Sequence, residues 1–456
     1  MKLGVDTPEI KNKLDELFSL ILAEQSQVTG LKESNPEKKH LVEQYLQEYA
    51  KNKGRGFFFN YLSSGRGHGP FTEQIDESIK YDLIGGIGPN ILGHSHPLYI
   101  KGTLEAATTD TIMCGNLLSY QEPAELTRTL LSSVSEKSKL RHFWFAGSGS
   151  FANDNALKII WQKTSPKNKI IAFEKAFAGR SIATQEITFN PAYRQGMPQH
   201  LNIEHVPHFN HFDQENSLKE TMEHLNRIWT KDKDNVCALM IELVQGEAGF
   251  NYGTKEYYQS IFKWAKERGL YIIVDEVQTF ARTRELFAFQ MFELDEYVDV
   301  VTIGKALQAC GTFYTEELNP KPGLIAGTFN GSLAALRVGN LIIEYLLNGH
   351  FYGESGRMKQ IEENFLSRLR YLSNNSCKGK IGYIGGIGTM LSFEVGDSSK
   401  SITDEFIKTL YKNGIICFSA GKDPYRVRFL VPTCLTDDHI DEIFRIIEKS
   451  ILEVII

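Results

Sequence analysis

The feature that most constrains the fold is an alternation of apolar runs with helical patterns through the middle of the chain. Strands alternating with helices are typical of βαβ units. We therefore predict an α/β fold with a mostly parallel central sheet flanked by helices. The expected strands are KIIAFE (169–174), VCALMIE (236–242), LYIIVDE (270–276) and DVVTIG (299–304), and the expected helices include DNALKIIWQK (154–163) and TKEYYQSIFKWAKERG (254–269).

The two ends of the chain have a different texture. Residues 7–51 are charged and predict helices, and a glycine-rich loop is expected from residue 81. From about residue 341, helical patterns surround short strands near 389–395, 415–420 and 425–430. We expect an N-terminal helical segment that also contributes to a small domain (1–80), a large domain (81–340) and a smaller α+β C-terminal domain (341–456).

Composition excludes several classes of protein. The net charge is −6 with both signs interspersed, so binding to nucleic acid is not expected. The six cysteines are widely spaced and include no CxxC pair, which favours neither a zinc site nor a disulfide framework. No run suggests a membrane span or a signal-peptide core, and free thiols suit a reducing compartment. We expect a soluble cytoplasmic protein that uses no metal and no membrane.

Two strand ends each carry a reactive residue. IIVDEVQT (272–279) brings Asp275, and VVTIGKA (300–306) brings Lys305, to the edge of the sheet where ligands bind. A lysine amine forms a Schiff base with an aldehyde, and a carboxylate beside a pyridine nitrogen keeps that nitrogen protonated. Alone, each residue would be an ordinary strand end or helix cap. Together, in this order, they predict a site for pyridoxal 5'-phosphate.

The chain resembles the class III aminotransferases, fold-type I enzymes that include ornithine, 4-aminobutyrate and lysine aminotransferases. The resemblance runs from about residue 81 to the C-terminus. It implies a fold-type I transferase that binds pyridoxal 5'-phosphate and forms a homodimer. It also implies that Lys305 carries the cofactor, that Asp275 pairs with the pyridinium, and that Gln278 contacts the ring hydroxyl.

The segment FAGSGSFANDNALK (145–158) matches the phosphate cup of the family. A helix N-terminus binds phosphate through exposed backbone N–H groups and the helix dipole. The resemblance places Gly149 and Ser150 at the contacting positions. Gly147 and Phe151 replace the Asn and Glu of the more common NSGxEAN motif. These replacements would keep the backbone contacts to the phosphate and change the side-chain contacts.

Two other segments resemble cofactor-binding motifs. KAFAGRS (175–181) is similar to AFHGRS, which implies that Phe177 stacks on the cofactor ring. AGTFNGSLAAL (326–336) is similar to STFGGNPLA, which implies that Thr328 reaches the phosphate bound by the neighbouring subunit. Active sites shared across a homodimer follow from this resemblance.

Acids and arginines bear on the choice of substrate. IELVQGEAGF (241–250) resembles EPVQGEGG, so Glu242 and Glu247 match the two acids of the family, the first at the cofactor. YRVRFLVP (425–432) resembles IRFxPPL, so Arg428 matches the arginine that holds a substrate carboxylate through both oxygens. In the family the acid matching Glu247 can mask this arginine, which lets one site take an ω-amine first and glutamate next.

Within the family, the wording of IGKALQACG (303–311) and of the phosphate cup is most similar to the lysine 6-aminotransferases. In that branch the arginine matching Arg180 holds the α-carboxylate of lysine. The resemblance implies transfer of an ω-amine, such as that of lysine, to 2-oxoglutarate. Ornithine, acetylornithine and 4-aminobutyrate are alternative donors. Aminomutation, decarboxylation or a non-catalytic role on the same fold are the other possibilities.

One segment departs from the family. DEVQTFARTRE (275–285) stands where the usual wording is DEVQTGxGRTG, so the chain is one residue shorter there and lacks the glycines. Because this loop borders the expected active site, its shape bears on specificity.

Overall fold

A computed structural model describes residues 4–57, 59–110, 113, 115, 117 and 119–455. The chain divides into two compact units. We call them the terminal unit (Met1–Thr108, Ile361–Gly385 and Thr389–Ile456) and the central unit (Thr109–Gln360 and Gly386–Gly388). The domain limits expected from the sequence, at 80/81 and 340/341, stay a prediction.

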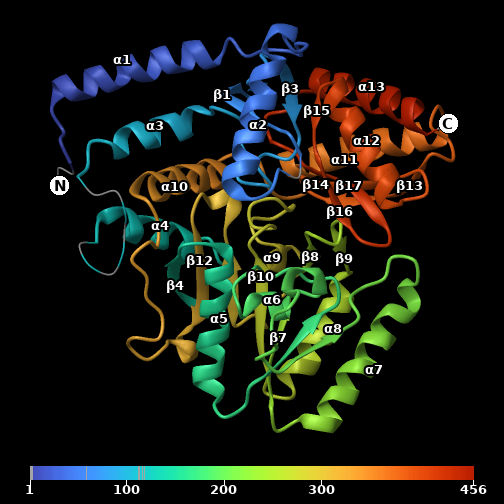
Figure 1. The fold of residues 1–456 in the computed structure, drawn as a ribbon. Coiled ribbons are helices and arrows are strands. Elements are labelled where there is room, and N and C mark those ends of the chain that lie inside the picture. The colour runs from blue at the N-terminus through green and yellow to red at the C-terminus, as the bar shows by residue number, and fades with distance from the viewer. Residues whose placement is uncertain are drawn as a thin grey trace. The chain divides into compact units, whose positions relative to one another are not determined.

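The central unit is built around a seven-stranded sheet (Figure 1). Strand β12 is antiparallel to both of its neighbours, and the other neighbouring pairs are parallel, so the predicted mostly parallel sheet is confirmed. The four strands expected from apolar runs are all present. The strand order is β4 (Leu140–Ala146), β12 (Cys310–Thr315), β11 (Val300–Ile303), β10 (Tyr271–Glu276), β7 (Val236–Ile241), β5 (Lys169–Phe173) and β6 (Ile203–Val206).

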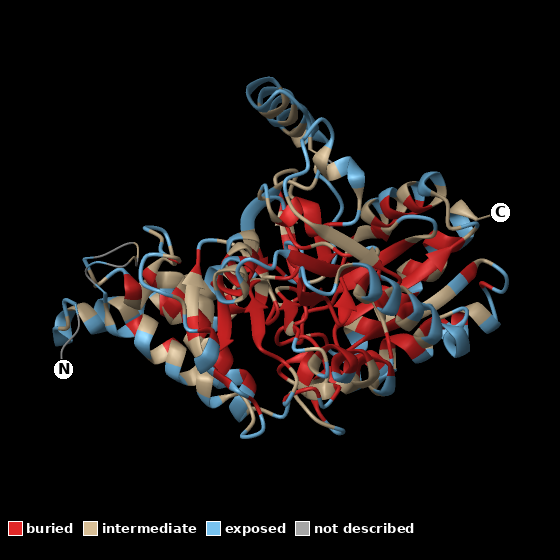
Figure 2. Ribbon diagram, turned by 90° about the horizontal axis from the view of Figure 1, so that it is seen from below, coloured by how far each residue is buried: buried red, intermediate tan, exposed pale blue. Residues whose placement is uncertain are grey.

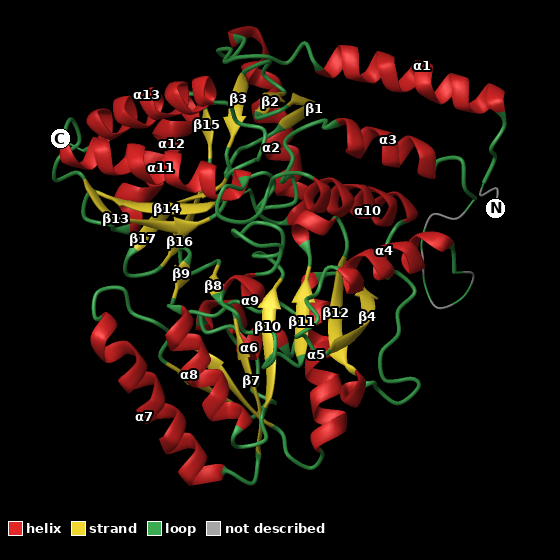
Figure 3. Ribbon diagram, turned by 180° about the vertical axis from the view of Figure 1, so that it is seen from behind, coloured by secondary structure: helices red, strands yellow, loops and turns green. Residues whose placement is uncertain are grey.

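Helices shield the central sheet from solvent (Figure 3). Helix α5 (Gly149–Thr164) packs on β4, β10, β11 and β12, while α8 (Lys255–Lys266) packs on β10 and α7 (Gln214–Asp232) on β6. Every residue of β5, β7 and β11 is buried, as expected for strands covered on both faces (Figure 2). The apolar runs in the sequence are a direct consequence of this double burial.

The rest of the central unit is helical or short. Helices α4 (Gln121–Ser132) and α10 (Leu333–Asn348) pack against each other. Strands β8 and β9 form a small hairpin of their own. The remaining elements are α6 (Thr184–Ile187), α9 (Ala288–Met291), β8 (Val244–Gln245), β9 (Asn251–Tyr252) and the 3-10 turns η2 (Pro191–Arg194), η3 (Lys305–Leu307) and η4 (Glu316–Leu318).

The terminal unit contains two four-stranded sheets. The first has the order β1 (Ser63–His68), β2 (Phe71–Gln74), β3 (Ile79–Asp82) and β15 (Ile415–Ile416), and the second has the order β13 (Ile381–Ile387), β14 (Met390–Val395), β17 (Tyr425–Leu430) and β16 (Phe418–Gly421). The short strands predicted near the C-terminus are thus confirmed. The helices are α1 (Pro8–Gln25), α2 (Lys39–Lys53), α3 (Pro97–Ala106), α11 (Arg357–Asn374), α12 (Lys400–Asn413) and α13 (Asp437–Val454), with the 3-10 turn η1 (Pro36–Lys38).

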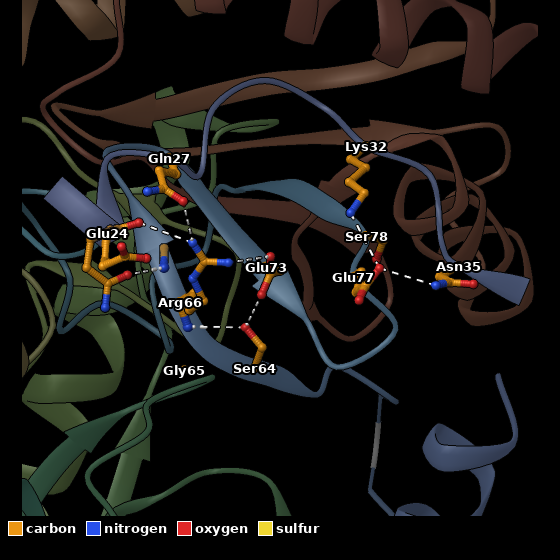
Figure 4. A network of polar contacts seen from close by, with 12 residues as sticks. Glu24, Gln27, Lys32, Asn35, Ser64, Gly65, Arg66, Glu73, Glu77 and Ser78 are labelled. Carbon is orange, nitrogen blue, oxygen red and sulfur yellow. Dashed lines mark hydrogen bonds and ion pairs between the residues drawn. The ribbon is translucent and has the colours of Figure 1, made fainter. Parts of the chain in front are cut away.

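A polar network ties the N-terminal segment to the hairpin β1–β2 (Figure 4). The Arg66 guanidinium donates to the backbone carbonyl of Glu24 at 3.2 Å and to the Glu73 carboxylate at 3.4 Å. Nearby, Lys32 and Asn35 both contact Glu77. These links explain why so polar a segment is ordered on the terminal unit. None of the described helices is long and apolar enough to cross a membrane.

Candidate active site

Parallel pairing of β10 with β11 brings the two predicted reactive residues to one edge of the sheet. Asp275 lies opposite Thr302 in this register, and Lys305 follows β11 after a single glycine. Lys305 begins the turn η3 and has φ 44°, in the left-handed region that side chains disfavour. Burial raises the pKa of both Asp275 and Glu242, and the positive charge of Lys305 partly opposes that rise.

Asp275 is buried and held from both sides. Its Oδ1 accepts the backbone N–H of Val277 at 2.9 Å, and its Oδ2 accepts the side-chain amide of Asn153 at 2.6 Å. Burial raises the pKa of Asp275, and these hydrogen bonds and the charge of Lys305 oppose that rise. A buried carboxylate in this setting is best stabilised by a cationic partner.

Glu242 closes β7 and organises two loops. Its carboxylate accepts the backbone N–H of Phe177 at 2.8 Å and that of Gly246 at 3.1 Å. Burial, and then the negative charge of Asp275, raises the pKa of Glu242. Glu242 therefore positions the segment that carries Phe177, whereas the resemblance had implied a contact with the cofactor itself, and that contact stays a prediction.

Gln278 offers an unused polar atom. Its Oε1 is buried and has no hydrogen-bond partner among the described residues. Gly246 lies against the same amide, since a Cβ at residue 246 would stand 2.3 Å from that oxygen. A buried acceptor without a partner is costly unless a ligand supplies a donor. The position fits a hydroxyl of a bound ring.

The predicted phosphate cup is the N-terminus of α5. Ser148 caps the helix by accepting the backbone N–H of Phe151 at 3.2 Å. Gly149 packs so tightly on Val277 that a Cβ would stand 2.7 Å from a valine methyl group. The exposed first-turn N–H groups of a 16-residue helix suit an anion. Glycine at 149 is thus required by close packing beneath the cup.

The second predicted motif meets the cup directly. The Ser150 hydroxyl accepts the backbone N–H of Arg180 at 3.1 Å, and Gly179 has φ 130° and lies against Ser150. The Arg180 guanidinium is exposed and stands 4.3 Å from the ring centroid of Tyr193 and 6.0 Å from that of Phe177. Tyr193 is a neighbour of Arg180 that no sequence motif indicated.

The segment carrying Thr328 also approaches the cup. A Cβ at Gly147 would stand 2.7 Å from the backbone oxygen of Phe329, and one at Gly115 would stand 3.0 Å from that of Thr328. The replacement of asparagine by Gly147 is therefore explained by a close backbone approach. The predicted reach of Thr328 to a phosphate in a second subunit stays a prediction.

The shortened loop after Gln278 is ordered by Glu276. This buried carboxylate accepts the backbone N–H groups of Ala288 at 2.8 Å and Phe289 at 2.9 Å, and the hydroxyl of Thr279 at 3.0 Å. Ala281 has φ 65°, so the loop keeps a left-handed residue in a region where the family has glycines. The loop differs in sequence from the family motif, and the hydrogen bonds to Glu276 hold it in place.

Glu247 and Arg428, two of the three predicted substrate residues, fall in different units. Glu247 follows Gly246 in the central unit. Arg428 lies in β17 of the terminal unit, fully buried, with its guanidinium 5.4 Å from the ring centroid of Phe418. The predicted pairing of Glu247 with Arg428 stays a prediction.

Comparison with known proteins agrees with this geometry. The profile of the family described as Aminotransferase class-III matches residues 52–451. An acetylornithine aminotransferase from Caldanaerobacter subterraneus subsp. tengcongensis is 28% identical over 403 residues, covering 85% of this chain and 94% of that protein.

Solved structures share the fold. Lysine aminotransferase from M. tuberculosis superposes with a TM-score of 0.79 at 20% identity, covering 90% of this chain and 99% of that one. Ornithine aminotransferase from Toxoplasma gondii gives a TM-score of 0.78 at 22% identity, covering 91% and 95%. At these identities the likeness concerns the fold alone.

Proposed function

Because this chain belongs to the class III aminotransferase family, we propose that it moves the side-chain amine of an amino acid of the ornithine type to 2-oxoglutarate, with N-acetylornithine as the first candidate donor. Members of the family use pyridoxal phosphate, which is therefore the cofactor. The observation that carries the proposal is the buried Asp275 on the strand next to the one that leads to Lys305. The active enzyme would be a homodimer.

This choice of amino donor differs from the donor that the short sequence motifs predicted. Short motifs favoured lysine, but acetylornithine aminotransferases are among the relatives that match over most of the chain. The lysine aminotransferase is similar at 20% identity, which speaks for the fold only. Acetylornithine thus takes precedence, and lysine is kept as the second candidate because the 303–311 motif favours it.

The residues of the site suit the cofactor. When bound, pyridoxal phosphate supplies an aldehyde that captures amines and a pyridinium ring that withdraws electrons from the substrate carbon. Asp275 would hold the proton on the ring nitrogen, and the unpartnered Oε1 of Gln278 would accept the ring hydroxyl. Gly149 and Ser150 would hold the phosphate at the N-terminus of α5, with Thr328 of a second chain.

Lys305 would carry out the proton transfer. Its Nζ would take a proton from the substrate carbon as a general base, hold it as an ammonium, and then give it up as a general acid. A positioned amine of this kind typically contributes about 10²–10⁴-fold to the rate. Phe177, held through its backbone by Glu242, would cover one face of the ring.

The arginines would divide the two carboxylates. Arg428 would bind the α-carboxylate of 2-oxoglutarate and glutamate, with Glu247 masking it when an ω-amine enters. Arg180, which is exposed beside Tyr193, would hold the α-carboxylate of the donor. Arg428→Ala is then expected to impair the glutamate half-reaction most and Arg180→Ala the donor half-reaction most, in single-turnover measurements of each.

A donor panel tests the proposal. Purified holoenzyme with 2-oxoglutarate is given N-acetylornithine, ornithine, lysine or 4-aminobutyrate, and glutamate is measured. We expect N-acetylornithine to give the highest kcat/KM. A clear preference for lysine would restore the second candidate. Release of CO₂ or a positional isomer without glutamate would mean decarboxylation or aminomutation, and no product from any of the four donors would reject the proposed donor class.

A further inference from the structure

A chain of hydrogen bonds runs behind Asp275 from three different elements. The hydroxyl of Thr302 in β11 contacts Oδ1 of Asn153 at 2.7 Å, and Nδ2 of Asn153 in α5 contacts Oδ2 of Asp275 at 2.6 Å. The same Nδ2 donates to the backbone oxygen of Ala178 at 2.7 Å. Asn153 and Thr302 are buried, with exposures of 1% and 0%.

The direction of each hydrogen bond is set by chemistry. The carbonyl of Ala178 can only accept, so the amide nitrogen of Asn153 must face it, and the amide oxygen must face Thr302. Thr302 therefore donates its proton to that oxygen. Both amide hydrogens of Asn153 are then used, one on Ala178 and one on Asp275. The amide cannot turn over without losing several of these bonds.

This arrangement favours one state of Asp275. Each carboxylate oxygen already faces an N–H donor, from Asn153 on one side and Val277 on the other. A proton added to the carboxylate would weaken these accepted hydrogen bonds, because a neutral carboxyl group is a poorer acceptor than a carboxylate. Burial works the other way and disfavours the charge. The hydrogen bonds thus oppose the effect of burial at the residue that must stay anionic.

Asn153 also joins two parts of the site. Ala178, which it holds, follows Phe177, and Phe177 is the residue expected to cover the cofactor ring. The N–H of Ala178 is held in turn by the hydroxyl of Thr188 at 3.0 Å. One buried amide therefore fixes the carboxylate and the stacking segment relative to each other.

We propose that Asn153, backed by Thr302, is a positioning pair that keeps the Asp275 carboxylate charged and oriented toward the ring nitrogen of the bound cofactor. The inference rests on the proposed function, because it assigns Asp275 to that nitrogen. Asn153 and Thr302 touch neither substrate nor reacting atoms in this scheme. They act through Asp275.

The test compares Asn153→Ala and Thr302→Val with wild type and with Asn155→Ala. Thr302→Val keeps the shape of the side chain and removes the hydroxyl. Asn155 lies two residues further along α5, and the structure gives it no contact with Asp275, so it is the matched control for loss of an asparagine from this helix. Circular dichroism and thermal unfolding verify that each variant is folded.

Two readouts are independent of turnover. The first is the affinity of the cofactor-free protein for pyridoxal phosphate. The second is the pH dependence of that affinity and of the visible absorbance of the bound cofactor. A hydrogen bond to a charged group corresponds to roughly a 10- to 100-fold effect. We expect Asn153→Ala to lose affinity by about that factor, and Thr302→Val to lose less.

The pH dependence of cofactor binding distinguishes a positioning role of Asn153 and Thr302 from a purely structural role. Removing the Asn153 donor raises the pKa of Asp275, so the acid limb of cofactor binding should move to higher pH in Asn153→Ala. Thr302→Val frees the Asn153 amide that makes this hydrogen bond, so its acid limb should move in the same direction by less. Asn155→Ala should behave as wild type. Unchanged pH profiles in folded Thr302→Val and Asn153→Ala would overturn the proposal. If Asn153→Ala does not fold, the profile of Thr302→Val alone decides.

Failure of the proposed function would look different. Wild-type protein would then not bind pyridoxal phosphate, or would bind it and give no glutamate in the donor panel. Normal binding and glutamate formation in wild type, with variants indistinguishable from it, would reject only the positioning pair.

Discussion

Lys305 holds a backbone conformation that residues with a side chain rarely adopt. Its φ is 44°, and Gln308 at the end of the same turn has φ 65°. Such conformations typically cost about 1–3 kcal/mol each and persist only where the surroundings determine them. Here the buried strands β11 and β12 enclose the turn on either side. We infer that the turn is retained because it presents the lysine amine at the strand ends.

The first prediction concerns this lysine. Borohydride treatment of the holoenzyme should fix the cofactor covalently to Lys305, and peptide mass spectrometry locates the adduct. Lys305→Ala should reduce turnover by at least about 10²–10⁴-fold, since proton transfer by a positioned amine contributes that much. It should still bind pyridoxal phosphate weakly through the α5 cup. An adduct on a different lysine would contradict the assignment.

The second prediction concerns Glu276. Burial raises the pKa of this carboxyl from 4.5 to about 7. The folded chain then binds the proton more tightly than the unfolded chain, so the stability this group contributes is complete below about pH 4.5 and is lost as the pH rises through 7. Replacement by glutamine removes the titration. The stability lost through Glu276→Gln should therefore be larger at pH 5 than at pH 7.5.

Urea unfolding of the cofactor-free protein at several pH values measures this difference. Comparison with wild type cancels other titrations, such as that of His208, whose pKa burial lowers to about 3. A stability loss through Glu276→Gln that is equal at both pH values would show that Glu276 stays charged throughout.

At the scale of single residues, the sequence predicted the reactive residues better than the residues that position them. Asp275 and Lys305 stand out because each ends an apolar run. Asn153 and Thr302 do not, because an asparagine in a helix and a threonine in a strand are usually solvated. The available signal was that Thr302 is the only polar residue in β11, and a polar side chain buried in such a strand needs a partner.

Among the elements, the parallel strands were predictable because burial on both faces leaves continuous apolar runs. The reversed strand β12 was not, since CGTFYT (310–315) mixes small, polar and aromatic residues. Its antiparallel pairing with β4 joins residues more than 150 positions apart, and no local pattern encodes such a contact. The turn at Ala281 was missed because alanine rarely takes a positive φ.

The third prediction concerns the packing of α5 on the loop beneath it. Gly149→Ala would place a methyl group 2.7 Å from Val277, so the first turn of α5 must shift. Overpacking of this kind typically costs about 1–3 kcal/mol. We expect lower stability and weaker binding of pyridoxal phosphate, because the backbone N–H groups of the cup move with the turn.

A second change supplies the control. Val277→Ala removes the methyl groups that the new side chain would meet. The double variant Gly149→Ala, Val277→Ala should therefore bind pyridoxal phosphate more tightly than Gly149→Ala alone. Thermal unfolding and cofactor titration report the two effects. Equal affinity of Gly149→Ala and wild type would mean that the glycine is not needed for the shape of the cup.

At the scale of the whole molecule, the match to the family spans both compact units, from residue 52 to residue 451. The sequence could indicate this much because its motifs are distributed along the chain. The donor could not be predicted in the same way, because specificity depends on how a few side chains from separate segments meet around a substrate. Short sequence motifs favoured lysine as the amino donor, whereas a relative aligned over most of the chain favours N-acetylornithine.

The fourth prediction is that each active site is completed by a second copy of the chain. In a homodimer with shared sites, Lys305 of one subunit works with Thr328 of the other. Lys305→Ala should be inactive because it lacks the amine. Thr328→Asp should be inactive because it sets a negative charge against the cofactor phosphate. Mixing the two inactive proteins under conditions that exchange subunits should restore activity.

The arithmetic follows from the symmetry of a two-fold dimer. A hybrid dimer contains one site with both residues intact and one site with neither. Random exchange of equal amounts makes about half of the dimers hybrid, so activity should reach about one quarter of the wild-type value. Native mass spectrometry confirms that hybrids have formed. If hybrids are present and no activity returns, Thr328 serves the site of its own subunit. A second mixture pairs wild type with the double variant Lys305→Ala, Thr328→Asp. If sites are shared, each site of this hybrid carries one substituted residue, so the hybrid should be inactive while the remaining wild-type dimers stay fully active.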